Sequence, residues 1–396
     1  MERATEATTT ILEVRCVSCG KGFSSGKPLG TCPDCGSILS CRYDYEKAKE
    51  TLTREGLRGR QKSLWRYREV LPDIAPQNVV TLGEGMTPIV TLMSGLLLKD
   101  DGLIPTGTFK ARGMAVAVSK AKDLGLTKLV VPSAGNAGAA LACYAARGGL
   151  AARVFMPTET PQSIVKECVQ FGAEVVQVDG NIGDAGARMR TQIDGYFDMS
   201  TLKEPYRLEG KKTMGYEIAE QTGFELPGAI VYPTGGGTGL LGMWKAFDEL
   251  EKLGLIGNER PRMFSVQSEA CAPIVASFAA GKDAPDPDYP DGTTVAVGLR
   301  VPRPFAGRQM VSVLRASKGG AISVSDSEML GAMKALAGEG VFACPEGAAT
   351  LAGYQRLLDA GSIARSEKVL LYNTGTGLKY LDLVRRTPSS RQGFIV

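Results

Sequence analysis

The stretch Pro105-Thr106-Gly107-Thr108-Phe109-Lys110-Ala111-Arg112-Gly113 sets one lysine among small and turn-forming residues, directly before an alanine- and valine-rich run typical of a helix. Lysine condenses with aldehydes, and burial or a neighbouring cation turns its amine into a nucleophile or base, so Lys110 is the first candidate catalytic residue. Two glycine-rich loops, 133–138 and 233–239, each follow an apolar run and precede a helix-like one. They are typical of strand-to-helix turns that bind anions.

Composition limits the classes to which the chain can belong. It has 396 residues, of which 43% are hydrophobic and 22% charged, which predicts a globular protein of two domains. The formal net charge of +4 is small for this length, so we expect a small-molecule substrate rather than nucleic acid or a membrane as partner. No apolar run reaches about 18 residues, and residues 1–10 are polar, so a cytoplasmic protein is expected.

The chain contains no histidine. This excludes Ser–His and Cys–His catalytic pairs, and it excludes metal sites with histidine ligands. Proton transfer must therefore depend on lysine, tyrosine, a carboxylate or a cofactor.

Four cysteines near the N-terminus form two Cys-x-x-Cys pairs, Cys16 with Cys19 and Cys32 with Cys35, separated by twelve residues. The spacing is typical of a zinc ribbon, in which each pair places two thiolates on one side of a tight turn. The zinc ion would be structural, because four thiolates leave no open position for a substrate. Two disulfides, disfavoured in a reducing compartment, and a ribbon without metal are the alternatives.

Apolar and amphipathic runs alternate along the middle of the chain. Helices are expected at 113–124, 136–147, 162–171 and 182–197, and strands at 128–131, 152–156 and 174–178. Strands that alternate with helices predict parallel sheets with right-handed crossovers. Outside this region we expect a linker helix at 43–60, a short strand at 79–82 and a surface loop at 282–291.

Six motifs in order along the chain resemble those of the threonine synthases: 82–88, 105–113, 133–136, 206–213, 233–239 and 374–379. The resemblance implies the tryptophan synthase β-like fold, known as fold type II of the pyridoxal-phosphate enzymes. It implies two three-layer α/β domains that bind pyridoxal 5'-phosphate between them. Several members also resemble this chain in their N-terminal Cys-x-x-Cys segment.

Carried over residue by residue, the resemblance assigns Lys110 as the lysine that holds the cofactor and moves protons between substrate carbons. Asn136 would hydrogen-bond the cofactor's ring oxygen, and Thr374 would meet the pyridine nitrogen. The cofactor phosphate would lie in the loop Gly235, Gly236, Gly237, Thr238 and Gly239. Alternatively, Lys110 is an ordinary lysine at a helix start, Asn136 forms an Asx turn or helix cap, and Thr374 is a turn hydroxyl. The alternative for the glycine loop is a dinucleotide site. The loop is not Gly-x-Gly-x-x-Gly, which opposes the last of these.

On the substrate side, the resemblance implies contacts from Ser133, Arg207 and Lys211. Arg207 and the nearby lysines 203, 211 and 212 would bind an anionic leaving group, unless the lysines form a solvated surface. The chain departs from the family at three places. Threonine synthases usually carry Asp after the catalytic lysine, Thr after the Asn and an Asn-Ser pair before the Pro-x-Arg element, where this chain has Ala111, Ala137 and Thr201-Leu202.

The sequence thus predicts an α/β enzyme of fold type II with a zinc-ribbon-like module. Residues 1–60 would form the module and linker helix, 61–120 with 215–396 the large domain, and 121–214 the small domain. The expected reaction converts O-phospho-L-homoserine and water to L-threonine and phosphate, in a homodimer. The alternatives are a serine or threonine dehydratase, a β-replacement enzyme such as cysteate synthase, a binding protein with a degenerate scaffold and a nicotinamide enzyme.

Overall fold

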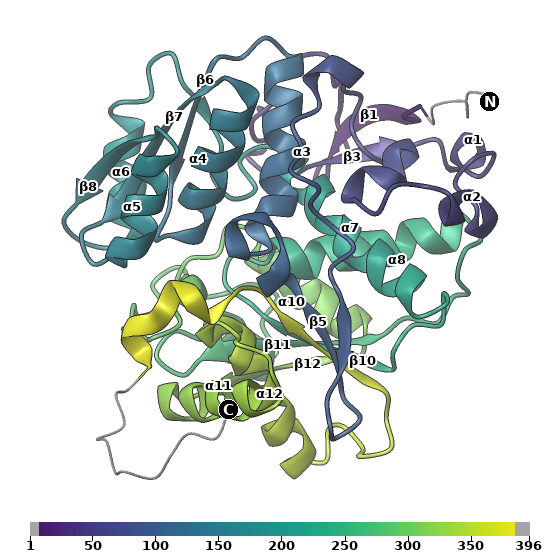
Figure 1. The fold of residues 1–396 in the computed structure, drawn as a ribbon, viewed down its shortest axis with the longest axis vertical. Coiled ribbons are helices and arrows are strands. Elements are labelled where there is room, and N and C mark those ends of the chain that lie inside the picture. Colours follow the sequence, from purple (N-terminus) through teal and green to yellow (C-terminus); the bar gives the residue numbers. More distant parts are fainter. Residues whose placement is uncertain (1–7, 385–396) are drawn as a thin grey trace.

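The N-terminal module is a small antiparallel sheet (Figure 1). The computed structural model describes residues 8–384, so the ends of the first and last predicted units lie outside the described residues. The sheet has the order β2-β1-β3. Its strands are β1 (Ile11–Cys16), β2 (Gly22–Phe23) and β3 (Leu39–Tyr43).

The predicted helix at 43–60 is wrong as a single element, because the structure has two short helices, α1 (Tyr45–Ala48) and α2 (Arg54–Arg58). The first helix ends at Ala48, and Thr53 starts the second. Its hydroxyl accepts from the Gly56 amide, which is the bond of a helix N-cap.

The larger sheet has six strands in the order β12-β11-β10-β13-β5-β4. All neighbours are parallel except β4 and β5. The strands are β4 (Ile89–Thr91), β5 (Leu97–Asp100), β10 (Ala229–Pro233), β11 (Arg262–Ser268), β12 (Gly320–Val324) and β13 (Val369–Asn373). Because β10 and β13 are buried along their whole length, they read as continuous apolar runs.

The second α/β sheet is parallel, in the order β8-β7-β6-β9. Its strands are β6 (Lys128–Pro132), β7 (Ala151–Pro157), β8 (Glu174–Val178) and β9 (Phe197–Asp198). Helices α4 (Asn136–Gly148), α5 (Gln162–Gln170) and α6 (Ile182–Arg190) pack against it. In Figure 1 this unit lies apart from the six-stranded sheet, at the upper left.

The predicted helix at 182–197 is too long. Helix α6 ends at Arg190, and Gly195 then turns the chain at a φ of 75°. Phe197 opens β9 beside Leu129 of β6. The predicted strand at 79–82 is wrong, because this segment pairs with no strand of the described part of the chain; the Val80 amide instead donates to the Ser119 hydroxyl at 2.8 Å.

Three long helices lie in the centre of the molecule: α3 (Lys110–Asp123), α7 (Tyr206–Gln221) and α8 (Thr238–Lys252). Helix α7 is buried from Tyr206 to Ala219, between α3 and α8. Helices α9 (Pro273–Ala279), α10 (Gly307–Ala316), α11 (Asp326–Gly338) and α12 (Pro345–Asp359) complete the side of the six-stranded sheet. Within residues 8–384, no helix is long and apolar enough to cross a membrane.

Buried charges join α3 to α7. Arg112 donates two bonds of 2.7 Å to the carboxylate of Asp101 and pairs also with Glu217 of α7. All three side chains are fully buried. Burial alone would raise the pKa of Asp101, but Arg112 lowers it to about 2. This network fixes the helix that begins with Lys110.

Residues 282–291 form an irregular loop that is largely exposed, as predicted. The four-stranded sheet falls within 121–214 and the six-stranded sheet within 61–120 and 215–396. The division into domains at these boundaries stays a prediction.

Candidate active site

Three segments that follow parallel strands meet at one cavity of about 590 Å³. Ser133 follows β6, Gly235 comes two residues after β10, and Thr374 follows β13. Lys110 lines the same cavity. The carboxyl ends of parallel strands are the usual ligand-binding edge of α/β sheets, so the fold brings together four of the predicted motifs at such an edge.

The loop before Lys110 is fastened to the segment after β13. Gly107 has a φ of 62°, and a Cβ there would lie 2.7 Å from Cγ2 of Thr376, so the turn requires glycine. The Phe109 amide donates to the Thr374 carbonyl at 2.9 Å. The Thr376 amide donates to the Gly107 carbonyl at 2.8 Å. These bonds hold Lys110 at the start of α3 with its side chain in the cavity wall.

The Lys110 amine lies in surroundings that favour its neutral form. Its Nζ is 4.4 Å from the ring centroid of Phe109. Burial lowers the pKa of Lys110 to about 8, and the positive charge of Arg207 acts in the same direction. Glu346 and Cys344 oppose this shift, but neither forms an ion pair with the amine. A lysine with this pKa can act as nucleophile or base near neutral pH.

The glycine loop after β10 leaves room in the cavity wall. A Cβ on Gly235 would lie 2.2 Å from the Gly298 carbonyl oxygen, so no other residue fits there. Gly236 also lines the cavity, and Gly237 caps α8 with a φ of 79°. The first turn of α8 therefore points its free backbone N–H groups toward the cavity, where they attract an anion.

The last two loop residues start α8. Thr238 lines the cavity and is buried. Gly239 lies behind the wall, where a Cβ would be 1.9 Å from the Tyr232 hydroxyl. Its lack of a side chain allows α8 to pack closely on β10, so Gly239 acts through packing rather than by reaching the cavity.

Asn136 begins α4 and points its amide at Tyr380, a residue of the 3-10 helix η6 (Gly377–Leu383). Its Nδ2 donates to the Tyr380 hydroxyl at 2.8 Å. Its Oδ1 is buried without a partner among the described residues. The Tyr380 hydroxyl in turn donates to Oε1 of Glu346 at 3.0 Å.

Sequence reasoning missed Glu346 and Tyr380. Glu346 is in the first turn of α12, where an acidic residue is usually interpreted as a helix-start signal. The available signal was the absence of histidine, which makes every carboxylate near a glycine turn worth testing as an acid or base.

Thr374 is buried and lines the cavity, with its Oγ1 3.7 Å from Cys344 Sγ. Ser133 also lines the cavity, but its hydroxyl is used within its own turn. It accepts from the amides of Gly135 and Gly138 at 3.1 and 2.9 Å. Ser133 therefore holds the turn in which Asn136 stands.

Comparison with known proteins identifies the family. Residues 80–375 match the family described as "Pyridoxal-phosphate dependent enzyme". The chain is 35% identical to threonine synthase of Methanocaldococcus jannaschii over 94% of each chain, and 36% identical to that of Methanosarcina acetivorans over 92% of each. The chain belongs to the threonine synthase family of pyridoxal-phosphate-dependent enzymes. The resemblance stated from the motifs is thereby confirmed.

Solved structures confirm the fold of the family. Maize serine racemase superimposes with a TM-score of 0.63 at 23% identity, covering 76% of this chain and 92% of that one. Threonine deaminase isoform 2 of Solanum lycopersicum superimposes with a TM-score of 0.64 at 20% identity, covering 90% and 96%. The predicted fold type II architecture is correct.

The cavity fits the cofactor of the family. Buried oxygens of Asn136, Thr108 and Glu346 have no partner among the described residues, so they are available to a polar ligand. The glycine loop presents backbone donors for a phosphate without side chains in the way. The amine of Lys110 is available to an aldehyde. The chain is a pyridoxal-phosphate-dependent enzyme, and its predicted cofactor-binding residues surround one cavity, apart from Gly239 behind its wall.

Arg207 and Lys211 do not line this cavity. Arg207 is buried and donates to the Met199 carbonyl at 2.5 Å. The Lys211 amine donates to the Phe109 carbonyl, and burial first, then the charge of Lys110, lowers the pKa of Lys211 well below the usual value. Both side chains lie behind the wall that carries Lys110.

The other two predicted lysines differ from each other. Lys212 is wholly buried in ion pairs with Glu209 and Glu249, so it lies neither on a solvated surface nor in the cavity. Lys203 is half-buried and does line the cavity, with Nζ 3.6 Å from the Phe305 ring centroid. Of this lysine group, only Lys203 can reach a ligand directly.

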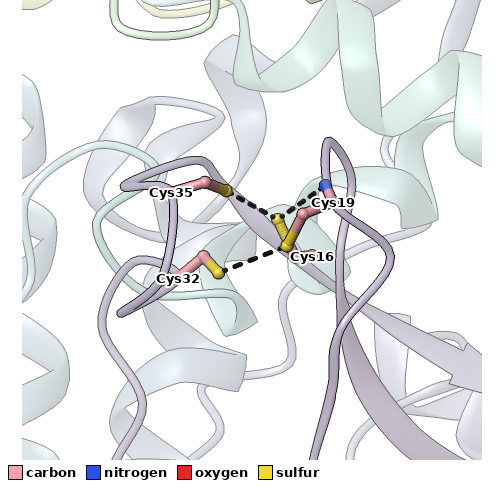
Figure 2. Close-up of side chains that lie close together, drawn as sticks. All are labelled: Cys16, Cys19, Cys32 and Cys35. Carbon is pink, nitrogen blue, oxygen red and sulfur yellow. Dashed lines mark hydrogen bonds between the residues drawn. The ribbon is translucent and has the colours of Figure 1, made fainter.

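The four N-terminal cysteines converge from two loops (Figure 2). Their sulfurs all lie within 4.8 Å of one another. The pairs Cys16–Cys35 and Cys19–Cys32 are 3.4 and 3.7 Å apart, and all four thiols are free. A tetrahedral zinc with Zn–S bonds of about 2.3 Å places its sulfurs about 3.8 Å apart. The cluster therefore fits zinc.

Proposed function

We propose that the protein converts O-phospho-L-homoserine and water to L-threonine and phosphate, by γ-elimination of phosphate and β-addition of water. The observation that supports this most is the amine of Lys110, which has no ion pair among residues 8–384 and faces a cavity lined by the glycine loop, Asn136 and Thr374. The chain that forms this site aligns over 94% of its length with a threonine synthase.

Pyridoxal phosphate, when bound, supplies an aldehyde and an electron-withdrawing ring that stabilises negative charge on the substrate carbons. Lys110 would hold the cofactor and, once released by the substrate amine, carry protons between the substrate carbons. Asn136 would donate to the ring oxygen, and the neutral hydroxyl of Thr374 would meet the ring nitrogen. The residues Gly235, Gly236, Gly237 and Thr238, at the N-terminus of α8, would bind the phosphate, while Gly239 packs behind them.

For the substrate phosphate we propose that Arg207 acts through charge, because it lies close enough to lower the pKa of Lys110 and its field therefore reaches the cavity. Lys211, whose pKa is lowered well below the usual value by burial first and then by Lys110, would gain its proton when the phosphate dianion enters the cavity. A dianion that enters a desolvated site must be compensated by positive charge. Lys203 lines the cavity and would give the direct contact, while Ser133 would orient the wall of the substrate site.

One assay tests the proposed reaction. The purified enzyme is incubated with O-phosphohomoserine, phosphoserine, serine and threonine, and phosphate, 2-oxo acid and threonine are measured. We expect equal amounts of phosphate and threonine from phosphohomoserine. An enzyme that releases no phosphate and deaminates serine or threonine would instead be a dehydratase.

We further propose one structural zinc ion per chain, bound by Cys16, Cys19, Cys32 and Cys35, in a cytoplasmic homodimer. The sulfur geometry supports the zinc; the dimer and the compartment rest on the resemblance and the sequence. Metal analysis of protein prepared without a metal-binding tag should find about one zinc per chain. Because the cysteines lie outside the cofactor motifs, chelation should lower stability more than it lowers the rate of the protein that remains folded.

A further inference from the structure

A second ionisable side chain faces the cavity beside Lys110. Glu346 is 5% exposed and lines the cavity. Its Oε1 accepts from the Gly298 amide at 2.8 Å and from the Tyr380 hydroxyl at 3.0 Å. Its Oε2 is buried and has no hydrogen-bond partner among residues 8–384. One oxygen is thus fixed by the protein, and the other is left for a ligand.

This arrangement is costly unless something binds Oε2, because a buried carboxylate oxygen without a partner loses its hydration. A purely structural first-turn glutamate has a different environment in the same molecule. Glu328, in the first turn of α11, uses both oxygens, to Arg356 and to Ser325. The contrast indicates that Oε2 of Glu346 serves a group in the cavity.

The charged and titratable groups around Glu346 are few. Lys110 of α3 feels its charge, as do Cys344 at the start of α12 and Tyr380 of η6. The Gly298 amide adds a neutral donor. Tyr380 already donates to Oε1, and the pKa of Cys344 is raised by burial first, so neither is poised to supply or remove a proton at neutral pH. Glu346 and Lys110 are left to share that work.

The proposed reaction, on which this inference rests, needs more than one proton-transfer group. Protons must leave the α- and β-carbons, enter at the γ-carbon and return to the α-carbon, and water must lose a proton when it adds. The amine of Lys110 transfers protons at the substrate carbon atoms, and the chain has no histidine that could take a proton from the water. A buried carboxylate with a free oxygen is suited to accept a proton from water.

We propose that Glu346 is a second catalytic residue, whose Oε2 binds the water that adds to the substrate and takes a proton from it. The water oxygen forms the bond to the β-carbon as the double bond between the α- and β-carbons opens, and the water proton passes to Oε2. The electron pair of that double bond goes to the α-carbon, which then takes a proton from Lys110. The carboxylic acid so formed then gives this proton to the released phosphate or to solvent, which restores the carboxylate for the next turnover.

Glu346→Gln tests the free oxygen alone. The amide oxygen of glutamine can keep the bonds from Gly298 and Tyr380, so only Oε2 is replaced, by an NH₂ group that accepts no proton. Elimination of phosphate should continue, since Lys110 is intact. Substrate that has lost phosphate but gains no water should leave as 2-oxobutyrate and ammonium. The rate of threonine formation should fall by about a hundredfold, which is a usual rate contribution of a general base, while the rate of phosphate release should fall by less than about tenfold.

A second readout needs no turnover. In protein freed of cofactor, the pKa of Lys110 is followed by the pH dependence of its reaction with an amine reagent. Glu346 favours the charged form of Lys110, so Glu346→Gln should lower the midpoint. Glu328→Gln is the matched control: it removes another first-turn carboxylate, outside the cavity, and should leave the product ratio and the midpoint unchanged.

Three results would overturn the proposal. The first is a Glu346→Gln enzyme with the wild-type rate and product ratio. The second is an equal fall of phosphate and threonine in a variant that still binds cofactor with the wild-type absorbance, since Glu346 would then act before water adds. The third is loss of cofactor or of folding, which would make Glu346 structural. A wild type that releases no phosphate contradicts the proposed function instead, and the midpoint of Lys110 then still shows whether Glu346 faces it.

Discussion

Two cations stand two residues apart on α3 and have opposite environments. Lys110 faces the cavity without an ion pair to any residue that the structure describes, and its pKa is lowered to about 8, first by burial. Arg112 faces the core, where Asp101 and Glu217 hold its charge and its pKa is raised well above the usual value. Residues at i and i+2 point to different sides of a helix, so one short motif supplies both a reactive amine and a fixed anchor. The difference shows that pairing, not burial, separates a structural cation from a chemical one.

The largest expected effect comes from replacing Lys110, the lysine that faces the cavity. Lys110→Ala should abolish nearly all turnover, a loss of at least about a thousandfold, because the nucleophile and base are removed together. Borohydride reduction of the yellow wild type should attach the cofactor to the peptide that contains Lys110. The variant should lose this label but keep the wild-type unfolding midpoint. Lys122→Ala, on the same helix and outside the cavity, should behave as wild type, and ordinary rates in Lys110→Ala would refute the assignment.

Replacing Arg112, the cation that faces the core, should lower the stability of the fold rather than the activity. Arg112→Ala leaves Asp101 without a cation and Glu217 paired only with Lys99, which costs about 3–5 kcal/mol. The urea midpoint should fall accordingly, while the folded fraction retains its cofactor absorbance. The control is Lys252→Ala, which breaks the exposed pair with Asp248 and should cost no more than about 0.5 kcal/mol. If Arg112→Ala were as stable as that control, the network would not be the anchor of α3.

The third prediction tests a cation that belongs to neither side. Arg207 lies behind the cavity wall but acts on it through charge. Arg207→Ala should raise KM and lower kcat/KM for phosphohomoserine by about a hundredfold, as for the loss of a charged partner. Arg207→Lys should restore part of it. Unchanged turnover of phosphohomoserine by Arg207→Ala would remove Arg207 from the substrate site.

The sequence predicted the cavity loops well and their surroundings poorly, for a physical reason. The loops at 105–110 and 233–239 depend on local backbone geometry, such as the positive φ of Gly107 and Gly237, which a glycine pattern reports directly. The site of Arg207 depends on Met199 and on Glu204, which is buried beside it; neither is a motif residue. No local pattern places that guanidinium behind the wall.

Glu346 shows the same limit more strongly. Its contacts come from Gly298 and Tyr380, which are 48 and 34 residues away in the chain. The predicted helix at 182–197 is too long because the turn at Gly195 and the pairing of Phe197 with Leu129 depend on the neighbouring strand. Turns and alternating apolar runs depend on residues that are adjacent in the sequence. Hydrogen-bond partners and strand pairing depend on residues that only the tertiary fold brings together.

The smallest expected effect is a pH dependence that separates the two cations of α3. Lys110 must lose its proton before it can attack the cofactor aldehyde, so the rate at which cofactor-free protein recaptures pyridoxal phosphate should rise with pH through a midpoint near 8. For one group with this pKa, the neutral fraction increases about tenfold between pH 7 and pH 9. Arg207→Ala should move the midpoint up, because a neighbouring positive charge that favours the neutral amine is lost. Arg112 stays charged throughout and should not contribute. Stopped-flow absorbance of the bound cofactor measures this rate, and a midpoint near 10.5, the usual value for lysine, would show that burial does not activate Lys110.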